Sequence, residues 1–594
     1  MRRQVRAGAE GQVLDPHRRG DKGVVWQPAE AQRRPGGGGE VAPSVNLSRA
    51  LAQSFLKANS DGSKGYHYYR NLSIGRVQGP TLAFAADREL EIGLHVPDPY
   101  WAVTADFEKY DDDGHATTVV HATYEKPRVD TAAEAQAIVA ACSGKEGTVD
   151  SVEAKKTILR PPTPFNIGDL QREAYRLFRA SPGYTLAIAE KLYLRALISY
   201  PRTASQKLPP SINYRKILSG LASSLYSKEA GILLEKERLV PREGALADPA
   251  HPAIYPTGLA PRGLAGLEFK VYDLIARRFL ATFGYPAVTE RMQAAIDVDV
   301  DDDKKYRFLA EGRATLYDGW MALYKPYVNF EQQQQPLPAL AQGEVLACRQ
   351  VAADEKFTQP PWRYSQASLL AKMEQEQIGT KATRADIIAT LFKRKYLSTE
   401  KGGGNNGGGG GIRVTDLGLA VVKSMRARVP AIVSTELTRS IEEELEMVER
   451  GEQASAQVIS HAVDRLVESL AAFRKNQSEI GRQIREEGNS GGAGAQKQSS
   501  KAADIVIGQC PLCKTGQLRI VTSRTTKKRF AGCSNYSSGC RATAPLPQRG
   551  GIRGARKACQ CGWPIISVAF GRRAKRWNVC VSMQCTYKEK KKAA

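Results

Sequence analysis

Tyr200 lies in the segment Leu197–Thr203, directly after a helix-like run, and Arg202 follows it two residues later. A tyrosine phenol has a pKa near ~10, so it is a poor nucleophile at neutral pH unless cations hold its target and stabilise the developing charge. An arginine fixed by the intervening Pro201 could hold a phosphate in front of the phenol. The segment fits a phosphate-attacking tyrosine, and it also fits a buried tyrosine that ends a helix.

Eight of the ten cysteines lie after residue 500, in two groups of four. Their spacings are C-x2-C-x19-C-x6-C and C-x-C-x18-C-x4-C. Tetrahedral Zn²⁺ takes four soft ligands, and close pairs on a small hairpin module supply them. The spacings therefore predict two zinc ribbons, whose folding energy the metal supplies. The predicted ligands are Cys510, Cys513, Cys533 and Cys540 in the first ribbon, and Cys559, Cys561, Cys580 and Cys585 in the second.

The same tail is strongly basic, with 20 Lys and Arg and two acidic residues from 501 to 594, a net charge of +18. Basic residues such as Lys528 and Arg529 alternate with rings such as Phe530. Rings can stack on unpaired bases while cations follow the phosphates, so the tail predicts contact with nucleic acid. Alternatively, the rings form the small cores of the ribbons. The two remaining cysteines, Cys142 and Cys348, are isolated and predict buried thiols.

The bulk composition describes a globular chain of 594 residues with 42% hydrophobic and 25% charged residues and a net charge of +24. No apolar run approaches the ~18 residues that a membrane helix needs, and no secretory signal opens the chain. We therefore expect no membrane contact and a cytoplasmic, chromosome-associated protein.

Helix-like and strand-like patterns alternate along the chain and predict an α+β multidomain protein with nested helical and β domains. Residues 1–44 are rich in Arg, Gly and Pro and predict a disordered leader. Gly402–Gly411 predicts a hairpin tip or loop. The expected segments are a helical base domain (45–98, continued at 346–484), a β-rich arch (99–165, continued at 288–345), a helical domain that carries Tyr200 (166–287), a linker (485–503), a zinc ribbon (504–548), and a second ribbon with a basic tail (549–594).

Six ordered segments resemble the type IA DNA topoisomerases, most closely the archaeal form, over about residues 45–475. Two departures from the family pattern are Ala204, where many members have aspartate, and Gln366, where many have glutamate. The matching segments are Ser73–Leu82 (SIGRVQGPTL), Ile198–Thr203 (ISYPRT), His251–Thr257 (HPAIYPT), Arg363–Leu369 (RYSQASL), Ile378–Ala385 (IGTKATRA) and Val414–Gly418 (VTDLG).

The resemblance implies a toroidal strand-passage gate and an isomerase that relaxes negatively supercoiled DNA without ATP. Tyr200 would attack a phosphodiester of single-stranded DNA and form a 5′-phosphotyrosyl link. Arg202 would hold the scissile phosphate, and His251 would lie beside it or relay a proton; a hydrogen-bonded loop histidine is the alternative. Gln78 could also be a structural amide. The residues implied to line the single-strand groove are Arg76, Gln78, Lys381, Thr383 and Arg384.

The family also implies an N-terminal acidic (Toprim) domain that holds Mg²⁺, and residues 1–44 do not resemble it. We therefore expect this chain to lack the Mg²⁺ site, through truncation or because a separate polypeptide supplies the domain. Asp297 and Asp299 are followed by a run of acids and lysines that predicts a solvated hairpin instead of a metal site. A non-catalytic single-strand-binding remnant is the second hypothesis. The topoisomerase half of a reverse gyrase ranks last, since the sequence has no Walker motif.

Overall fold

The computed structural model describes eleven stretches of the chain, and the leader predicted at 1–44 lies outside them. Helix α15 continues to Gly488, so the predicted linker at 485–503 begins with helix, and its residues 489–503 lie outside the described part. Among the described residues, no helix combines the length and apolar composition needed to cross a bilayer. The described residues are 47–55, 72–110, 116–301, 304–328, 336–400, 411–488, 505–523, 528–548, 551–569, 577–582 and 585.

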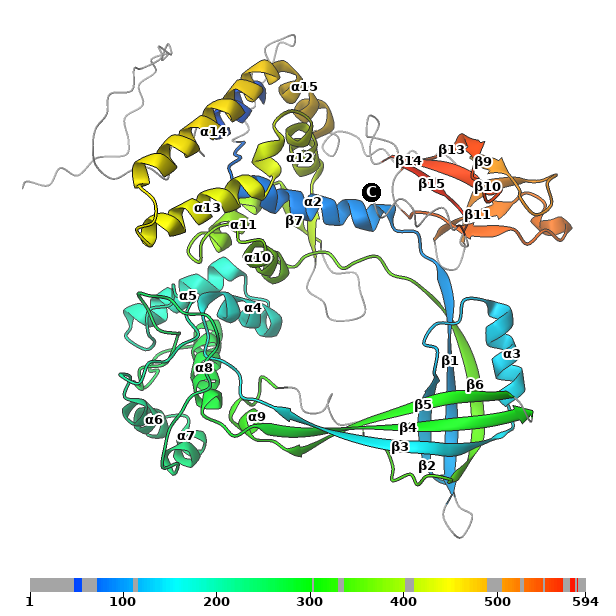
Figure 1. Ribbon diagram of the computed structural model, residues 1–594, viewed down its shortest axis with the longest axis horizontal. Helices are drawn as coiled ribbons and strands as arrows, with labels where there is room; N and C mark the ends of the chain where they lie inside the picture. The colour runs from blue at the N-terminus through cyan, green and yellow to red at the C-terminus, as the bar shows by residue number, and fades with distance from the viewer. Residues whose placement is uncertain are drawn as a thin grey trace, which may run out of the picture. The chain divides into compact units, whose positions relative to one another are not determined.

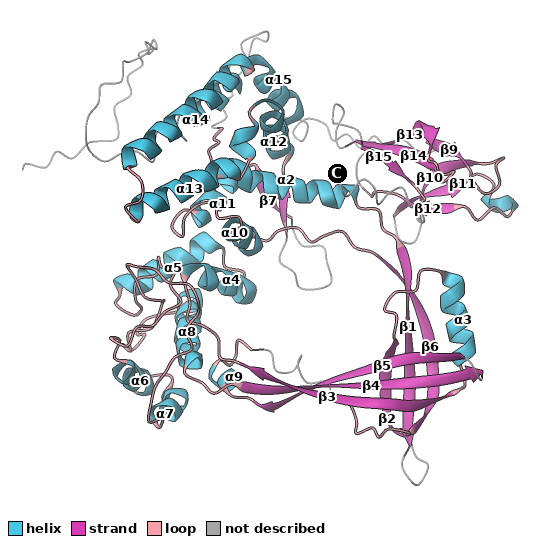
Figure 2. Cartoon of the chain, viewed as in Figure 1, coloured by secondary structure: helices cyan, strands magenta, loops and turns pink. Residues whose placement is uncertain are grey.

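Six antiparallel strands close into a barrel in the order β1-β2-β5-β4-β3-β6, drawn in magenta in Figure 2. Alternate residues of β1 from Val103 to Phe107 are buried in the barrel, and the rings of Phe107 and Phe308, both fully buried, meet edge to face at 5.9 Å. Helix α3 packs against β1 and β6. The elements of this barrel unit are β1 (Pro99–Tyr110), β2 (Ala116–Tyr124), α3 (Ala132–Cys142), β3 (Glu146–Leu159), β4 (Ala287–Asp301), β5 (Lys304–Tyr317) and β6 (Val345–Phe357).

Strand β6 carries the barrel to Phe357, twelve residues beyond the arch boundary that the sequence placed at 345. Its inward residues, among them Leu346 and Val351, are separated by exposed polar positions, so the strand pattern was too weak to find. Asp297, Asp299 and Asp301 lie on β4, which pairs with β5 as the predicted hairpin, although Asp297 is buried and not solvated as predicted. There Arg307 donates to both Asp297 oxygens at 2.7 and 2.8 Å.

A helical unit, here called the base unit, gathers segments from both halves of the chain around one core (Figure 1). Helix α2 packs on η2 so closely that a Cβ at Gly79 would lie 1.9 Å from the Ile432 carbonyl oxygen. Strands β7 and β8 pair antiparallel on either side of the glycine-rich run, whose residues 401–410 lie outside the described part. The elements are α2 (Gln78–Leu94), α10 (Gln366–Gln375), α11 (Arg384–Lys393), β7 (Leu397–Thr399), β8 (Ile412–Val414), α12 (Asp416–Arg428), the 3₁₀ turn η2 (Pro430–Val433), α13 (Glu436–Glu449), α14 (Ser455–Lys475) and α15 (Gln477–Gly488).

The described tail consists of a four-stranded sheet in the order β12-β11-β10-β9 and a three-stranded sheet in the order β13-β14-β15. Buried side chains of both sheets share one small core, in which Leu518 and Val568 are fully buried. The elements are β9 (Val506–Gln509), β10 (Gln517–Thr522), β11 (Arg529–Cys533), η3 (Tyr536–Ser538), β12 (Thr543–Pro545), β13 (Gly551–Ala558), β14 (Pro564–Ala569) and β15 (Trp577–Cys580).

The segment between β3 and β4 forms a second helical group, here called the Tyr200 unit. Its helices begin where the sequence supplies caps: the Asn166 side chain accepts from the Asp169 amide, and Ser181 precedes a proline at the first position of α5. The long helix α8 buries a continuous apolar stripe against the others. The helices are α4 (Ile167–Phe178), α5 (Pro182–Leu194), α6 (Tyr214–Ala222), α7 (Ser227–Leu234), α8 (Gly266–Thr282) and, after the return from the barrel, α9 (Trp320–Leu323).

The buried carboxylate of Asp273 joins three parts of the Tyr200 unit. It accepts hydrogen bonds from the Tyr226 hydroxyl at 2.9 Å, from the Tyr327 hydroxyl at 2.5 Å and from Arg277 Nε at 3.1 Å. Burial, followed by the nearby carboxylate, raises the pKa of both phenols well above the ordinary value, so both remain protonated donors. Tyr327 follows strand β5 of the barrel. The cluster therefore anchors the chain that returns from the barrel to the Tyr200 unit.

Replacing Asp273 by alanine would leave two phenols and one guanidinium buried without their shared acceptor. We expect Asp273→Ala to destabilise the unit by about 3 kcal/mol, measured as faster hydrogen exchange throughout α7 and α8. Glu446→Ala, which removes the exposed Glu446–Arg450 pair, is the control and should cost about 0.5 kcal/mol or less. Equal effects of the two substitutions would contradict the account.

Candidate active site and metal sites

Two segments of the Tyr200 unit are held together by hydrogen bonds beside the candidate nucleophile. The Ser199 amide donates to the Tyr255 carbonyl at 2.9 Å, and the Thr257 amide donates to the Leu197 carbonyl at 3.0 Å. The Ser199 hydroxyl adds a bond to the Ala253 carbonyl at 3.1 Å. The strand-like segment 197–199 is thus fixed to segment 253–257, and the residue that follows it has a defined position.

Tyr200 and His251 are neighbours, although fifty residues separate them in the chain. Their rings are tilted by 49° with centroids 4.6 Å apart. The exposed ring of Tyr193, at the end of α5, also packs edge to face on Tyr200, with centroids 5.4 Å apart. Tyr200 itself is half-buried. The alternative of a fully buried helix-ending tyrosine does not describe this position, because the phenol remains partly accessible.

The Arg202 guanidinium is held by an acid that the sequence did not single out. Its Nε donates to Glu190 Oε1 at 2.7 Å, and Glu190 lies on α5, the helix that precedes the Tyr200 segment in the chain. Arg202 Nη1 reaches the Ala382 carbonyl of the base unit at 3.4 Å. The side chain is 30% exposed, so a phosphate could approach it. Glu190 lies twelve residues before Arg202 and outside the motif, so nothing in the motif indicated it.

Asp248 is a second residue that the sequence did not single out. Its side chain is only 2% exposed, accepts hydrogen bonds from the Ala204 and Ala250 amides at 3.1 Å each, and forms an ion pair with Lys381. Burial alone would raise the pKa of Asp248, but the bonds from Lys381 and the two amides outweigh it and lower that pKa. Their stabilisation is therefore complete above the ordinary aspartate pKa and is lost as the pH falls through the lowered one.

The side chains implied to line a single-strand groove all lie on the base unit, and the cations among them have acidic partners. Arg76 Nη1 contacts Glu442 at 2.8 Å, Lys381 pairs with Asp248, and Arg384 Nη1 lies 3.6 Å from Glu374. Gln78 accepts from the Ser73 hydroxyl at 3.2 Å, and exposed Thr383 contacts Thr380. Segment 378–384 therefore lies against the Tyr200 unit, through both Arg202 and Asp248.

With these positions established, comparison with known proteins identifies the family. A sequence model of the DNA topoisomerase family matches residues 45–460, which include Tyr200, His251 and segment 378–384. DNA topoisomerase 1 of Pyrococcus horikoshii is 40% identical over 91% of this chain and 74% of its own length. DNA topoisomerase 1 of Methanothermobacter thermautotrophicus is 37% identical over 92% of this chain and 68% of its own length.

The chain belongs to the type IA DNA topoisomerase family.

The fold is also similar to that of a solved topoisomerase. The full-length topoisomerase I of Thermotoga maritima superposes with a TM-score of 0.53, covering 87% of this chain and 78% of that one at 23% identity. At this identity the likeness is evidence for the fold alone. It confirms the predicted multidomain α and β architecture.

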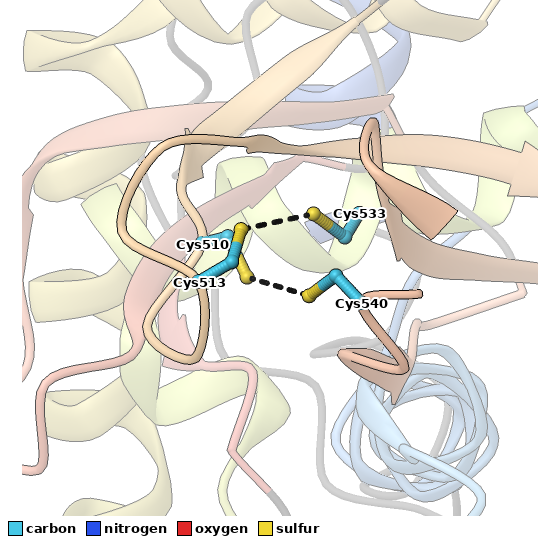
Figure 3. A group of neighbouring side chains, drawn as sticks. All are labelled: Cys510, Cys513, Cys533 and Cys540. Atoms are coloured by element: carbon cyan, nitrogen blue, oxygen red, sulfur yellow. Dashed lines mark hydrogen bonds between the residues drawn. The ribbon is translucent and has the colours of Figure 1, made fainter. Parts of the chain in front are cut away.

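The first predicted cysteine set of the topoisomerase comes together in the tail (Figure 3). Cys510 and Cys540 sulfurs are 3.7 Å apart, and Cys513 and Cys533 sulfurs are 3.6 Å apart. Sulfurs at the corners of a tetrahedron about 2.3 Å from Zn²⁺ lie about 3.8 Å from one another. The Gly516 amide donates to Cys513 Sγ at 3.2 Å and lowers the pKa of that thiol to about 6. The set could hold zinc.

The second set meets the same test. Cys559 and Cys585 sulfurs are 3.6 Å apart, and Cys561 and Cys580 sulfurs are 3.4 Å apart. All four sulfurs of each set lie within 4.8 Å of one another. The tight C-x-C pair does not prevent the four thiols from converging, so this set could also hold zinc.

The two basic residues predicted to bind nucleic acid beside the first set have different surroundings. Lys528 Nζ lies 5.2 Å from the centre of the Phe357 ring. Arg529 packs inward, with Nε donating to the Pro547 carbonyl, and burial lowers the pKa of its guanidinium. That Lys528 and Arg529 contact DNA stays a prediction. The inward packing of Arg529 indicates that its side chain also stabilises the fold of the tail.

In the described stretches, the two cysteine sets are the only groups of three or more metal-ligating residues whose ligand atoms converge. Asp297 and Asp299 are paired with Arg307 and Lys305. Asp111–Asp113 and residues 302–303 lie outside the described part. Among the described carboxylates, no group of three or more converges as the cysteines do.

Proposed function

We propose that this topoisomerase cleaves one strand of negatively supercoiled DNA through Tyr200, passes a strand through the break and reseals it. The phenol oxygen would bond to phosphorus while the bond from phosphorus to the 3′ oxygen breaks. The phenol proton leaves for the solvent or a base, and the 3′ oxygen takes a proton. The 5′-phosphotyrosyl diester retains the bond energy, so religation needs no ATP. The observation that supports this most strongly is the half-buried Tyr200, whose ring contacts the rings of His251 and Tyr193.

Arg202 would supply the cation that the phenol needs. Its guanidinium, now bonded to Glu190, is partly exposed and lies two residues from Tyr200. A phosphate could replace the carboxylate or share the guanidinium with it, and a bidentate contact would stabilise the added negative charge. His251, in ring contact with the phenol, would lie beside the same phosphate or relay the phenol proton.

The substrate would be single-stranded DNA held by the base unit. There, phosphates would compete with carboxylates for the cations, so binding should weaken as salt rises. We place the protein on the chromosome in the cytoplasm. The residues proposed to contact the strand are Arg76, Gln78, Lys381, Thr383 and Arg384, with Lys528 and Arg529 in the tail.

We further propose that the domains follow the predicted segments, with β6 assigned to the arch. Because residues 1–44 do not resemble the acidic metal-binding domain of the family, we propose that this domain, supplied by another segment or polypeptide, completes the site. Efficient relaxation by residues 45–594 alone would contradict that part of the proposal.

The tail would be held by two structural zinc ions, each bound by four thiolates of one cysteine set. Zinc supplies folding energy there, because each ribbon has too small a core to fold by itself. The proposal is supported by the convergence of the sulfurs in both sets.

Covalent trapping tests the role of Tyr200. We expect the protein, supplied with the acidic domain where it is needed, to form a denaturant-resistant adduct with an end-labelled single-stranded oligonucleotide. Tyr200→Phe should reduce the adduct at least ~1,000-fold, because the nucleophile is gone. Tyr184→Phe, an exposed tyrosine on α5, is the matched control and should leave it unchanged.

An adduct that persists in Tyr200→Phe would assign the nucleophile elsewhere. Salt-dependent binding without any adduct, in the presence of the acidic domain, would favour the non-catalytic single-strand-binding function.

Metal analysis tests the tail. We expect about two zinc ions per chain, falling to about one in Cys513→Ala or in Cys561→Ala, since each substitution removes one of four ligands. Cys348→Ala, a barrel cysteine remote in sequence from both sets, is the control and should retain both ions. A purified, folded protein with fewer than two zinc ions per chain would contradict the assignment.

A further inference from the structure

Asp248 occupies a junction between the two segments of the candidate active site and the base unit. Its carboxylate accepts from the Ala204 amide, four residues after Tyr200, and from the Ala250 amide, next to His251. The same carboxylate pairs with Lys381, which belongs to segment 378–384 of the base unit. One buried side chain therefore touches all three segments on which the proposed chemistry depends.

The chemistry of the junction favours a charged, fixed carboxylate. A carboxylate that is only 2% exposed is stable in its charged form only if hydrogen bonds and a paired cation offset the cost of desolvation. Two amides and one ammonium supply those partners. Removing Lys381 would leave a buried carboxylate with two amide donors and no counter-ion. Contact between the base unit and the Tyr200 unit therefore affects how firmly Asp248 holds the Ala204 and Ala250 amides.

A second contact joins the same two surfaces. Arg202 Nη1 reaches the Ala382 carbonyl, next to Lys381, at 3.4 Å. Segment 378–384 is held by internal hydrogen bonds, since the Thr380 amide donates to the Thr383 hydroxyl at 3.0 Å and the Arg384 amide donates to the Thr380 carbonyl. A hydrogen-bonded loop that contacts both Arg202 and Asp248 can link the base unit to the Tyr200 segment and to the His251 segment.

We propose that Asp248 is a positioning residue that couples contact with the base unit to the placement of the Tyr200 and His251 segments. It acts through the Ala204 and Ala250 amides and touches no reacting atom. When the two units separate, Lys381 leaves and the carboxylate holds the nucleophile segment less firmly. The inference rests on the proposed role of Tyr200 for its catalytic meaning, but the coupling itself is a property of the DNA-free protein.

Hydrogen exchange of the full chain without DNA measures this coupling. We expect Lys381→Met and Asp248→Asn each to accelerate exchange of the Ala204 amide and of the 378–384 amides by on the order of tenfold, the effect of losing a charged hydrogen bond. The double variant should be no faster than Asp248→Asn alone, because both substitutions remove the same ion pair with Lys381. Lys381→Arg should restore protection.

The matched control is Lys423→Met. Lys423 is as exposed as Lys381, both at 36%, and pairs with Glu487 inside the base unit. It should leave the Ala204 amide unchanged. Unchanged Ala204 exchange in Lys381→Met, or additive effects in the double variant, would overturn the coupling.

Binding of a labelled oligodeoxythymidine separates positioning from a general structural role. Asp248→Asn keeps an amide-accepting oxygen, removes a negative charge and frees Lys381, so its affinity should equal or exceed that of the parent protein. A loss of affinity greater than about threefold, together with faster exchange throughout the Tyr200 unit, would indicate misfolding and overturn the proposal. Neither readout requires cleavage, so failure here is distinct from failure of the Tyr200 assignment.

Discussion

The backbone hydrogen bonds between residues 197–207 and 251–257 are the constraint on which the candidate active site depends. Ser199 to Tyr255 and Thr257 to Leu197 form a short ladder, and the Ala253 amide extends it to the Lys207 carbonyl at 2.8 Å. Because backbone bonds fix position whatever the side chains, the ladder brings two distant segments into one place. The Tyr200 and His251 rings can then meet without any requirement for a long-range side-chain bond.

Carboxylates accompany the cations that would bind the DNA strand. Arg202 is held by Glu190, Lys381 by Asp248 and Arg76 by Glu442. Outside the leader and the basic tail, the charges of the chain nearly balance. At each of these cations, a DNA phosphate would therefore replace a carboxylate. The carboxylates orient the guanidinium and ammonium groups before DNA arrives, but they also compete with the phosphates and so weaken DNA binding.

The elements that the sequence predicted are those whose signals are local. The β4–β5 hairpin and the two cysteine sets are each encoded within a short stretch. Glu190 and Asp248 were missed because their importance comes from contacts with residues far along the chain. Strand β6 was missed because its inward positions are spaced irregularly. The neighbourhood of Tyr200 and His251 followed only from resemblance to the family.

Mass spectrometry of trapped protein tests the central assignment most directly. Cleavage after arginine and lysine releases Ala196–Arg202, in which Tyr200 is the one tyrosine, and separates it from the preceding peptide that carries Tyr193. After reaction with single-stranded DNA, in the presence of the acidic domain, and nuclease digestion, the account predicts a nucleotide linked through its 5′ phosphate to Tyr200. A nucleotide on Tyr193 or on any other residue, with Ala196–Arg202 unmodified, would contradict it.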